Sequence, residues 1–243
     1  MYVESPHVLH SNVLSGLEAL ARAVQLRHVC LHLTDVDAAP MTESVPGLVL
    51  CTLLAVGSIQ HLSLSQNSWH PAGFDTPSAN LFAGALRSSR LQSLHFECFG
   101  LFSDVDAAVA VLSALVAHPS LRSLEVISEN FLDVHDDVGR QRIGSLLATL
   151  VAPADQHAGL EVLSVPRCDL RDVGLRPLCD ALRSTTRLHA LNCAEHGASE
   201  IFVRRHFLPA VRANAALHCL KCGMSGLIMD AALRAERLVA SRR

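Results

Sequence analysis

The chain has 243 residues, of which 50% are hydrophobic, 18% charged and 4% aromatic, and its formal net charge is -3. A core so poor in aromatic rings must be built mainly from leucine, valine and alanine, which favours many small, similar layers over one bulky centre. The charge balance gives no basic footprint for a phosphate backbone, so nucleic acid is not an expected partner.

Residues 1–7 lack the basic start and apolar run of a secretory signal. The most apolar stretch, residues 105–117, is too short to cross a bilayer, which needs about 20 residues. Eight cysteines are present, and apart from the C-x-x-C pair Cys219 and Cys222 they are scattered. We therefore expect an intracellular, cytoplasmic protein in a reducing compartment, without a membrane span.

A six-position frame, L-x-x-L-x-L, recurs seven times along the chain. Its copies begin at Leu26, Ile59, Leu91, Leu121, Leu160, Leu188 and Leu217. Successive starts lie 33, 32, 30, 39, 28 and 29 residues apart, so the unit that starts at Leu121 is lengthened. The longer motif has Asn or Cys at position nine and an apolar residue at position eleven, and only the second and fifth copies match it fully.

Helix-like segments alternate with these frames, at residues 14–24, 78–86, 104–117, 143–150, 173–182, 201–213 and 229–239. In each short strand, frame positions one, four and six point to one face and positions three, five and seven to the other. Each unit alone leaves its apolar side uncovered, and stacking covers it. The sequence thus predicts an α/β solenoid of about seven repeats, with a parallel β-sheet on the concave face and helices on the convex face.

We expect a single domain over residues 1–243. It would comprise an N-terminal flanking or capping helix within residues 1–25, seven repeats over residues 26–228 and a C-terminal helix over residues 229–243.

The frame Leu160–Leu170, LEVLSVPRCDL, and the frame Ile59–Trp69 carry a family resemblance. With a helix in each unit and periods near 28 to 33 residues, they resemble the ribonuclease-inhibitor-like class of leucine-rich repeats. The resemblance implies a horseshoe and, in most relatives, recognition of a protein. It brings no catalytic residues, and the partner depends on surface residues that the repeat itself does not specify.

Positions three, five and seven supply the concave face. The first three units are polar and rich in histidine there, whereas the fifth and sixth units carry mostly small side chains. The candidate partner-binding residues are His28, Cys30, His32, His61, Ser63, His95, Glu97, Glu125, Asn192 and Lys221. The alternative interpretation is a face that is merely solvated.

Two clusters raise the question of a metal. His28, Cys30, His32 and His61 could approach a zinc ion from neighbouring strands, but side chains on one flat sheet diverge, so we expect no metal and no cofactor. The acidic run at residues 133–137 lacks the glycine and distant glutamate of a calcium loop and is interpreted as a solvated loop and helix start.

The cysteines fit the repeat. Cys219 and Cys222 fall at positions three and six, which point to opposite faces, so they are not expected to pair or to share a metal. Cys168, at the turn position, and Cys193, at position six, are expected to be buried structural residues.

The chain contains no glycine-flanked serine, phosphate-binding glycine loop or H-E-x-x-H motif, so we expect no enzyme. The expected function is a non-catalytic protein-protein interaction module that binds a protein partner. One alternative is the substrate-recognition part of a ligase or effector whose catalytic segment lies outside this chain, and another is a structural spacer.

Overall fold

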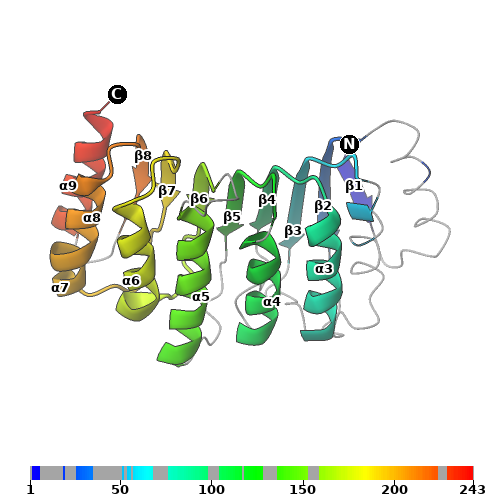
Figure 1. The fold of residues 1–243 in the computed structure, drawn as a ribbon, viewed down its shortest axis with the longest axis horizontal. Coiled ribbons are helices and arrows are strands. Elements are labelled where there is room, and N and C mark those ends of the chain that lie inside the picture. The colour runs from blue at the N-terminus through cyan, green and yellow to red at the C-terminus, as the bar shows by residue number, and fades with distance from the viewer. Residues whose placement is uncertain are drawn as a thin grey trace.

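The structure, a computed structural model, describes residues 2–5, 19, 26–34, 51, 54–55, 57–67, 76–97, 104–116, 118–127, 136–152, 159–223 and 229–242. Their strands are β1 (Tyr2–Ser5), β2 (His28–Thr34), β3 (His61–Asn67), β4 (Ser93–Glu97), β5 (Ser123–Ile127), β6 (Val162–Ser164), β7 (Ala190–Asn192) and β8 (Cys219–Lys221). These strands form one parallel sheet in the order of the chain. The successive strands therefore stack along one axis, with the helices along one side of the sheet (Figure 1).

Cys51, Leu54 and Ala55 are helical although no helix is predicted there from the sequence. The helices with described bounds fall where the sequence predicts them. They are α3 (Thr76–Ser88), α4 (Val105–Val116), α5 (Asp137–Val151), α6 (Arg171–Leu182), α7 (Glu200–Phe202), η1 (Val203–Phe207), α8 (Leu208–Ala213) and α9 (Met229–Ala240). The last predicted repeat helix, over residues 201–213, is thus α7 and α8 joined by the wider π-helical turn η1. The helix predicted over residues 14–24 lies outside the described residues, apart from Ala19, which is helical.

The leucines at frame position four lie side by side across the sheet. In the strand register each one pairs with the next, and all are buried, with Leu220 the most exposed at 7%. The row consists of Leu62, Leu94, Leu124, Leu163, Leu191 and Leu220. The predicted continuous interior row is confirmed, and the architecture is an α/β repeat solenoid.

A repeated backbone contact fixes this register. The carbonyl oxygen at frame position two accepts hydrogen bonds from the amides at positions two and three of the next unit. At Gln60 O, for example, the donors are Gln92 N at 2.7 Å and Ser93 N at 3.0 Å. The carbonyl of Arg122 does the same across the lengthened unit, accepting from Glu161 N at 2.7 Å. The extra residues of that unit are therefore absorbed outside the strands.

Helix α5 of the lengthened unit packs very closely against α6. A β-carbon added at Gly144 would lie 1.9 Å from the carbonyl oxygen of Gly174, so no larger residue fits without separating the helices. Two glycines, facing each other from consecutive units, therefore allow the close approach.

Two further elements lie at the ends of the described sheet. Strand β1 extends the sheet beyond the seven predicted strands by pairing with β2, although no frame precedes Leu26. At the other end α9 lies against β8, where Glu236 Oε1 accepts a hydrogen bond from the amide of Cys222 at 2.8 Å. Among the described residues, no helix combines the length and apolar character needed to cross a bilayer.

Candidate functional site

Strand residues at positions three, five and seven form the face of the sheet opposite the helices, called here the open face. The register aligns them in rows, as predicted. Position three contributes His28, His61, Ser93, Ser123, Val162, Ala190 and Cys219, and position five contributes Cys30, Ser63, His95, Glu125, Ser164, Asn192 and Lys221. Adjacent strands are about 4.8 Å apart, so neighbours in a row can touch.

The candidate binding residues differ in exposure. His28, Glu97 and Lys221 are exposed. The half-buried members are Cys30, His61, Ser63, His95, Glu125 and Asn192. His32 lies in β2 beside Ser65, but its side chain is outside the description. The described candidates therefore share one face, and their role in binding stays a prediction.

The first two strands carry a stacked pair of imidazole rings. The ring centroids of His28 and His61 lie 4.2 Å apart, with an angle of 8° between the planes. Burial lowers the pKa of His61, and charge on His28 lowers it further. The stack therefore favours the neutral form of His61 and offers a flat aromatic platform on the open face.

The third and fourth strands carry an imidazole-carboxylate pair. Nδ1 of His95 lies 3.5 Å from Oε2 of Glu125. The hydrogen bond to Glu125 raises the pKa of His95 against the opposing effect of burial, and the charges of Glu125 and Glu97 add to the rise. The same hydrogen bond lowers the pKa of Glu125, with a smaller contribution from Lys221. Each partner thus favours the charged form of the other.

The fifth and sixth strands present smaller groups that bond to each other. Nδ2 of Asn192 donates to Oγ of Ser164 at 3.1 Å, and Oδ1 of Asn192 accepts from the amide of Ala194 at 3.4 Å. In the adjacent row, the side chains are Val162 and Ala190. With its polar atoms engaged internally and its other side chains short, this half of the open face leaves room for a partner backbone.

The described residues contain no group of three or more histidine, cysteine, aspartate or glutamate side chains placed to hold a metal ion. The side chain of His32, the fourth residue of the zinc cluster considered above, lies outside the described part of the chain. The described members of that cluster, His28, Cys30 and His61, therefore do not form such a group, and the expectation of no metal remains a prediction.

The cysteine pair points as predicted. Cys222 is buried and donates its thiol to the carbonyl of Ala232 at 3.5 Å, whereas Cys219 is half-buried on the open face. Cys168 and Cys193 are buried, as predicted, and burial raises the pKa of both thiols. These buried thiols are protonated and unsuited to nucleophilic chemistry.

The described end of the acidic run is a helix start, as predicted. Oδ1 of Asp136 accepts the amide of Gly139 at 2.6 Å and so caps α5, while Asp137 pairs with Arg140 at 3.2 Å. A carboxylate here stabilises the electropositive helix N-terminus. Residues 133–135 lie outside the described residues.

A buried serine-histidine pair escaped the sequence analysis. Ser89 and His118 lie in the turns that lead into β4 and β5, and Oγ of Ser89 is 2.9 Å from Nε2 of His118. The second ring nitrogen, Nδ1, accepts from the amide of Ser120 at 3.4 Å, and burial lowers the pKa of His118. Both ring nitrogens are thus engaged inside the fold, so the pair supports the turns and is not an exposed nucleophile.

In the sequence, buried polar residues that support the turns, such as Ser89 and His118, can be recognised as polar side chains two or three positions before a frame. Asn214, three positions before Leu217, donates to the carbonyls of Leu182 and Thr185 at 2.7 and 3.1 Å. Ser89 stands only two positions before its frame. Because the number of residues between the polar side chain and its frame varies, aligning the units on their leucines alone does not reveal that these polar residues all support the turns.

A second missed residue is His196, at position nine of the sixth unit, where the motif has Asn or Cys. It is fully buried, and Nδ1 accepts the amide of Leu170 in the preceding unit at 3.3 Å. Burial lowers the pKa of His196 to about 4, although the Val165 backbone and the charge of Asp169 act in the opposite direction. The histidine thus links two turns in its neutral form.

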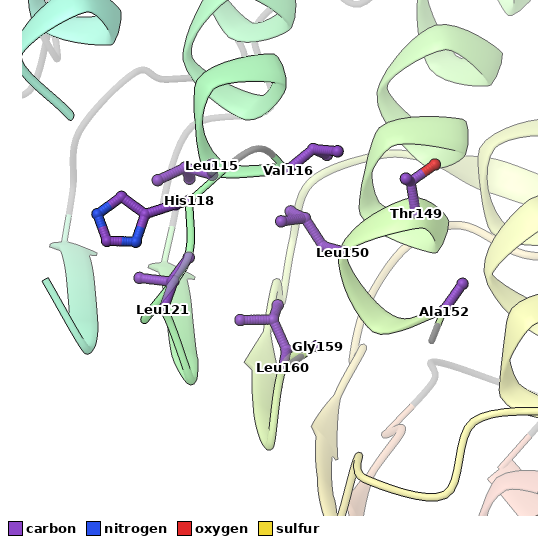
Figure 2. Close-up of a pocket in the computed structure, with 9 residues that line it drawn as sticks. All are labelled: Leu115, Val116, His118, Leu121, Thr149, Leu150, Ala152, Gly159 and Leu160. Atoms are coloured by element: carbon purple, nitrogen blue, oxygen red, sulfur yellow. The ribbon is translucent and has the colours of Figure 1, made fainter. Parts of the chain in front are cut away.

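Figure 2 shows a pocket between the C-terminal ends of α4 and α5. Its lining consists of Leu115, Val116, His118, Leu121, Thr149, Leu150, Ala152, Gly159 and Leu160. The ring of His118 is already bonded to Ser89, and the hydroxyl of Thr149 donates to the carbonyl of Ser145 at 2.9 Å. The polar side chains of the lining are therefore engaged within the protein and do not converge on a ligand.

Comparison with known proteins adds no assignment. No family model matches the chain, and no curated protein matches it significantly. The function must therefore be argued from the geometry of the open face.

Proposed function

We propose that the chain is a leucine-rich-repeat protein of the ribonuclease-inhibitor-like class that binds a protein partner on its open face, the concave side of a horseshoe. The observation that carries this proposal is the alternation of buried and exposed positions within each strand. Frame positions one, four and six are apolar and almost all buried in unit after unit, while positions three, five and seven change in chemistry and are mostly partly or fully exposed, Ser65 and Ser164 being buried exceptions. A surface that varies on a repeated scaffold is suited to recognising one particular partner.

The two halves of the open face suggest how a partner would lie. The platform of His28 and His61 and the pair of His95 and Glu125 offer aromatic area and hydrogen bonds. Beyond them, Val162 and Ala190 let a partner backbone approach. Specificity would therefore come from the first four units, and close packing from the next two.

The cellular setting follows the same proposal. All seven described cysteines are free, including Cys30 and Cys219 on the open face. Unpaired thiols are typical of a reducing compartment, so we place the interaction in the cytoplasm.

Affinity capture from the source cell tests the proposal, with the whole chain as bait and His61→Ala/His95→Ala as the variant. The matched control is Arg87→Gln/Arg90→Gln, two exposed arginines near the end of α3 on the helical side. We expect a stoichiometric partner on wild type and control, and affinity for that purified partner reduced by about tenfold or more in the histidine variant.

Equal retention by all three proteins would contradict binding through this part of the open face. Circular dichroism of each variant verifies that the stack is intact.

A further inference from the structure

The two ends of the chain differ in charge. Residues 1–170 contain 8 Lys and Arg against 17 Asp and Glu, whereas residues 171–243 contain 12 Lys and Arg against 6 Asp and Glu. The net charge of the whole chain, -3, therefore conceals a basic C-terminal end. The helical side of the last units shows where part of that charge is exposed.

The wide turn η1 brings three basic side chains in succession toward the surface. Val203 and Phe207 are buried at its two ends, while Arg204 and Arg205 are exposed and His206 is half-buried. A π-helical turn holds one residue more than an α-helical turn, so the extra residue adds to the outward-facing set. Such turns are frequent at functional sites.

A neighbouring helix adds a further cation. Nη1 of Arg176, from α6, lies 3.5 Å from Nε2 of His206. The His206 ring is in turn supported by Phe202, whose ring centroid lies 5.3 Å away at an interplanar angle of 28°. Because a guanidinium can only donate, Nε2 of His206 accepts this bond, and the imidazole is held beside the guanidinium with its Nδ1–H left as the ring's donor.

Arg176 and Arg205 differ from the arginines of this region that pair with a carboxylate. Arg204 pairs with Glu200. Ion pairs also engage Arg122, Arg140, Arg142, Arg167, Arg171, Arg183 and Arg187. Within the described part of the chain, no carboxylate lies within 4.0 Å of the guanidinium of Arg176 or Arg205. All donors of the Arg205 guanidinium, and those of Arg176 that do not bond to His206, therefore remain available to an external carboxylate.

The spacing of the exposed cations indicates the shape of the ligand. Arg205 and Arg212 are both exposed and stand seven residues apart on the continuous helix of η1 and α8, a separation of about 10 Å at the usual helical rise. One phosphate cannot reach both. An extended chain advances about 3.3 Å per residue, so a few acidic residues would span the distance.

We propose that Arg176, Arg205, His206 and Arg212, called here the basic strip, dock an extended acidic segment of a partner protein. Guanidinium groups bind carboxylates in a two-pronged geometry, and exposed pairs of this kind weaken as salt increases. The basic strip lies on the helices, on the opposite side of the sheet from the open face, so the inference is independent of the function proposed above.

A fluorescent hexaglutamate peptide, titrated into the whole chain at low salt, tests the proposal. We expect binding that weakens with added salt and that falls about fivefold to tenfold in Arg176→Gln/Arg205→Gln. Arg87→Gln/Arg90→Gln makes the same change in net charge away from the basic strip and should shift the affinity less than about twofold.

The remaining outcomes separate the alternatives. The proposal would be overturned if the peptide did not bind, or if the two double-arginine variants weakened binding equally. It would also be overturned if inorganic phosphate displaced the peptide when the two ligands supply the same concentration of negative charge. A concentration-dependent dimer that only the basic-strip variant loses would assign the surface to a second copy of this chain instead. The open-face variant His61→Ala/His95→Ala should bind the peptide normally, and circular dichroism confirms that each variant is folded.

Discussion

The two faces of the sheet obey different constraints, although their residues alternate along the same strands. On β5 the side chain of Leu124 is fully buried, whereas its neighbours Ser123 and Glu125 are partly exposed. The covered face repeats nearly the same apolar residues because each unit must match the next. The open face makes no such demand, and its chemistry changes from stacked imidazoles to small side chains within six strands.

This contrast teaches that stability and recognition are separable in this fold. A substitution on the covered face removes contacts with both neighbouring units, because Leu124 lies between Leu94 and Leu163. A substitution on the open face alters only what a partner would meet. Three predictions, taken from the largest expected effect to the smallest, put this separation to the test.

Leu124→Ala should lower the free energy of unfolding by about 2–5 kcal/mol, because it removes a buried side chain and leaves a cavity in the stack. The matched change Ser123→Ala, one residue earlier on the open face, should alter it by less than about 0.5 kcal/mol. Urea unfolding followed by circular dichroism measures both. Similar losses in the two variants would remove the distinction between the faces.

Acidification should lower the free energy of unfolding through the buried His196. Its pKa in the fold is about 4, below the ordinary value of 6.5, so the folded state binds fewer protons than the unfolded chain between these values. The stability due to the neutral ring is present above pH 6.5 and is lost as the pH falls toward 4, by about 3 kcal/mol in all.

His196→Asn should remove this part of the pH dependence, because asparagine is a usual residue at position nine of the motif and does not titrate. Urea midpoints of both proteins between pH 7 and pH 4 measure the difference, in which the contribution of His118 cancels. Parallel curves for the two proteins would show that His196 does not titrate as its burial requires.

Glu125→Gln should have the smallest effect on stability, below about 1 kcal/mol, because the pair with His95 is partly exposed. The raised pKa of His95 and the lowered pKa of Glu125 mean that the pair stabilises the fold fully between pH 4.5 and 6.5, and loses its effect as the pH rises through the folded pKa of His95 or falls through that of Glu125. A proton NMR titration should show a lower pKa for His95 in the variant. An unchanged pKa would mean that the carboxylate does not act on the ring.

The periodic part of the molecule could be predicted from the sequence. Position four of every frame carries leucine or valine, and this regularity correctly placed strands β2 to β8, their register and the helices from α3 to α9. The frames also placed His95 and Glu125 at the same position of consecutive units, so their proximity followed from the alignment. Strand β1 could not be predicted in this way, because four residues without a frame carry no period.

Non-periodic contacts required the tertiary structure. Arg140 shows this most clearly, since its buried guanidinium bonds to the carboxylate of Asp169 at 2.9 Å from the next unit. Ser89 and His118 likewise meet across units whose connecting turns differ in length.

The sequence by itself determined which side of each strand is covered, because alternation and a period near 30 residues leave a single way to bury the leucines. Only the tertiary structure decided which polar side chains meet in the turns and which arginines remain unpaired on the helices. Those contacts depend on loop lengths and rotamers that no repeat encodes.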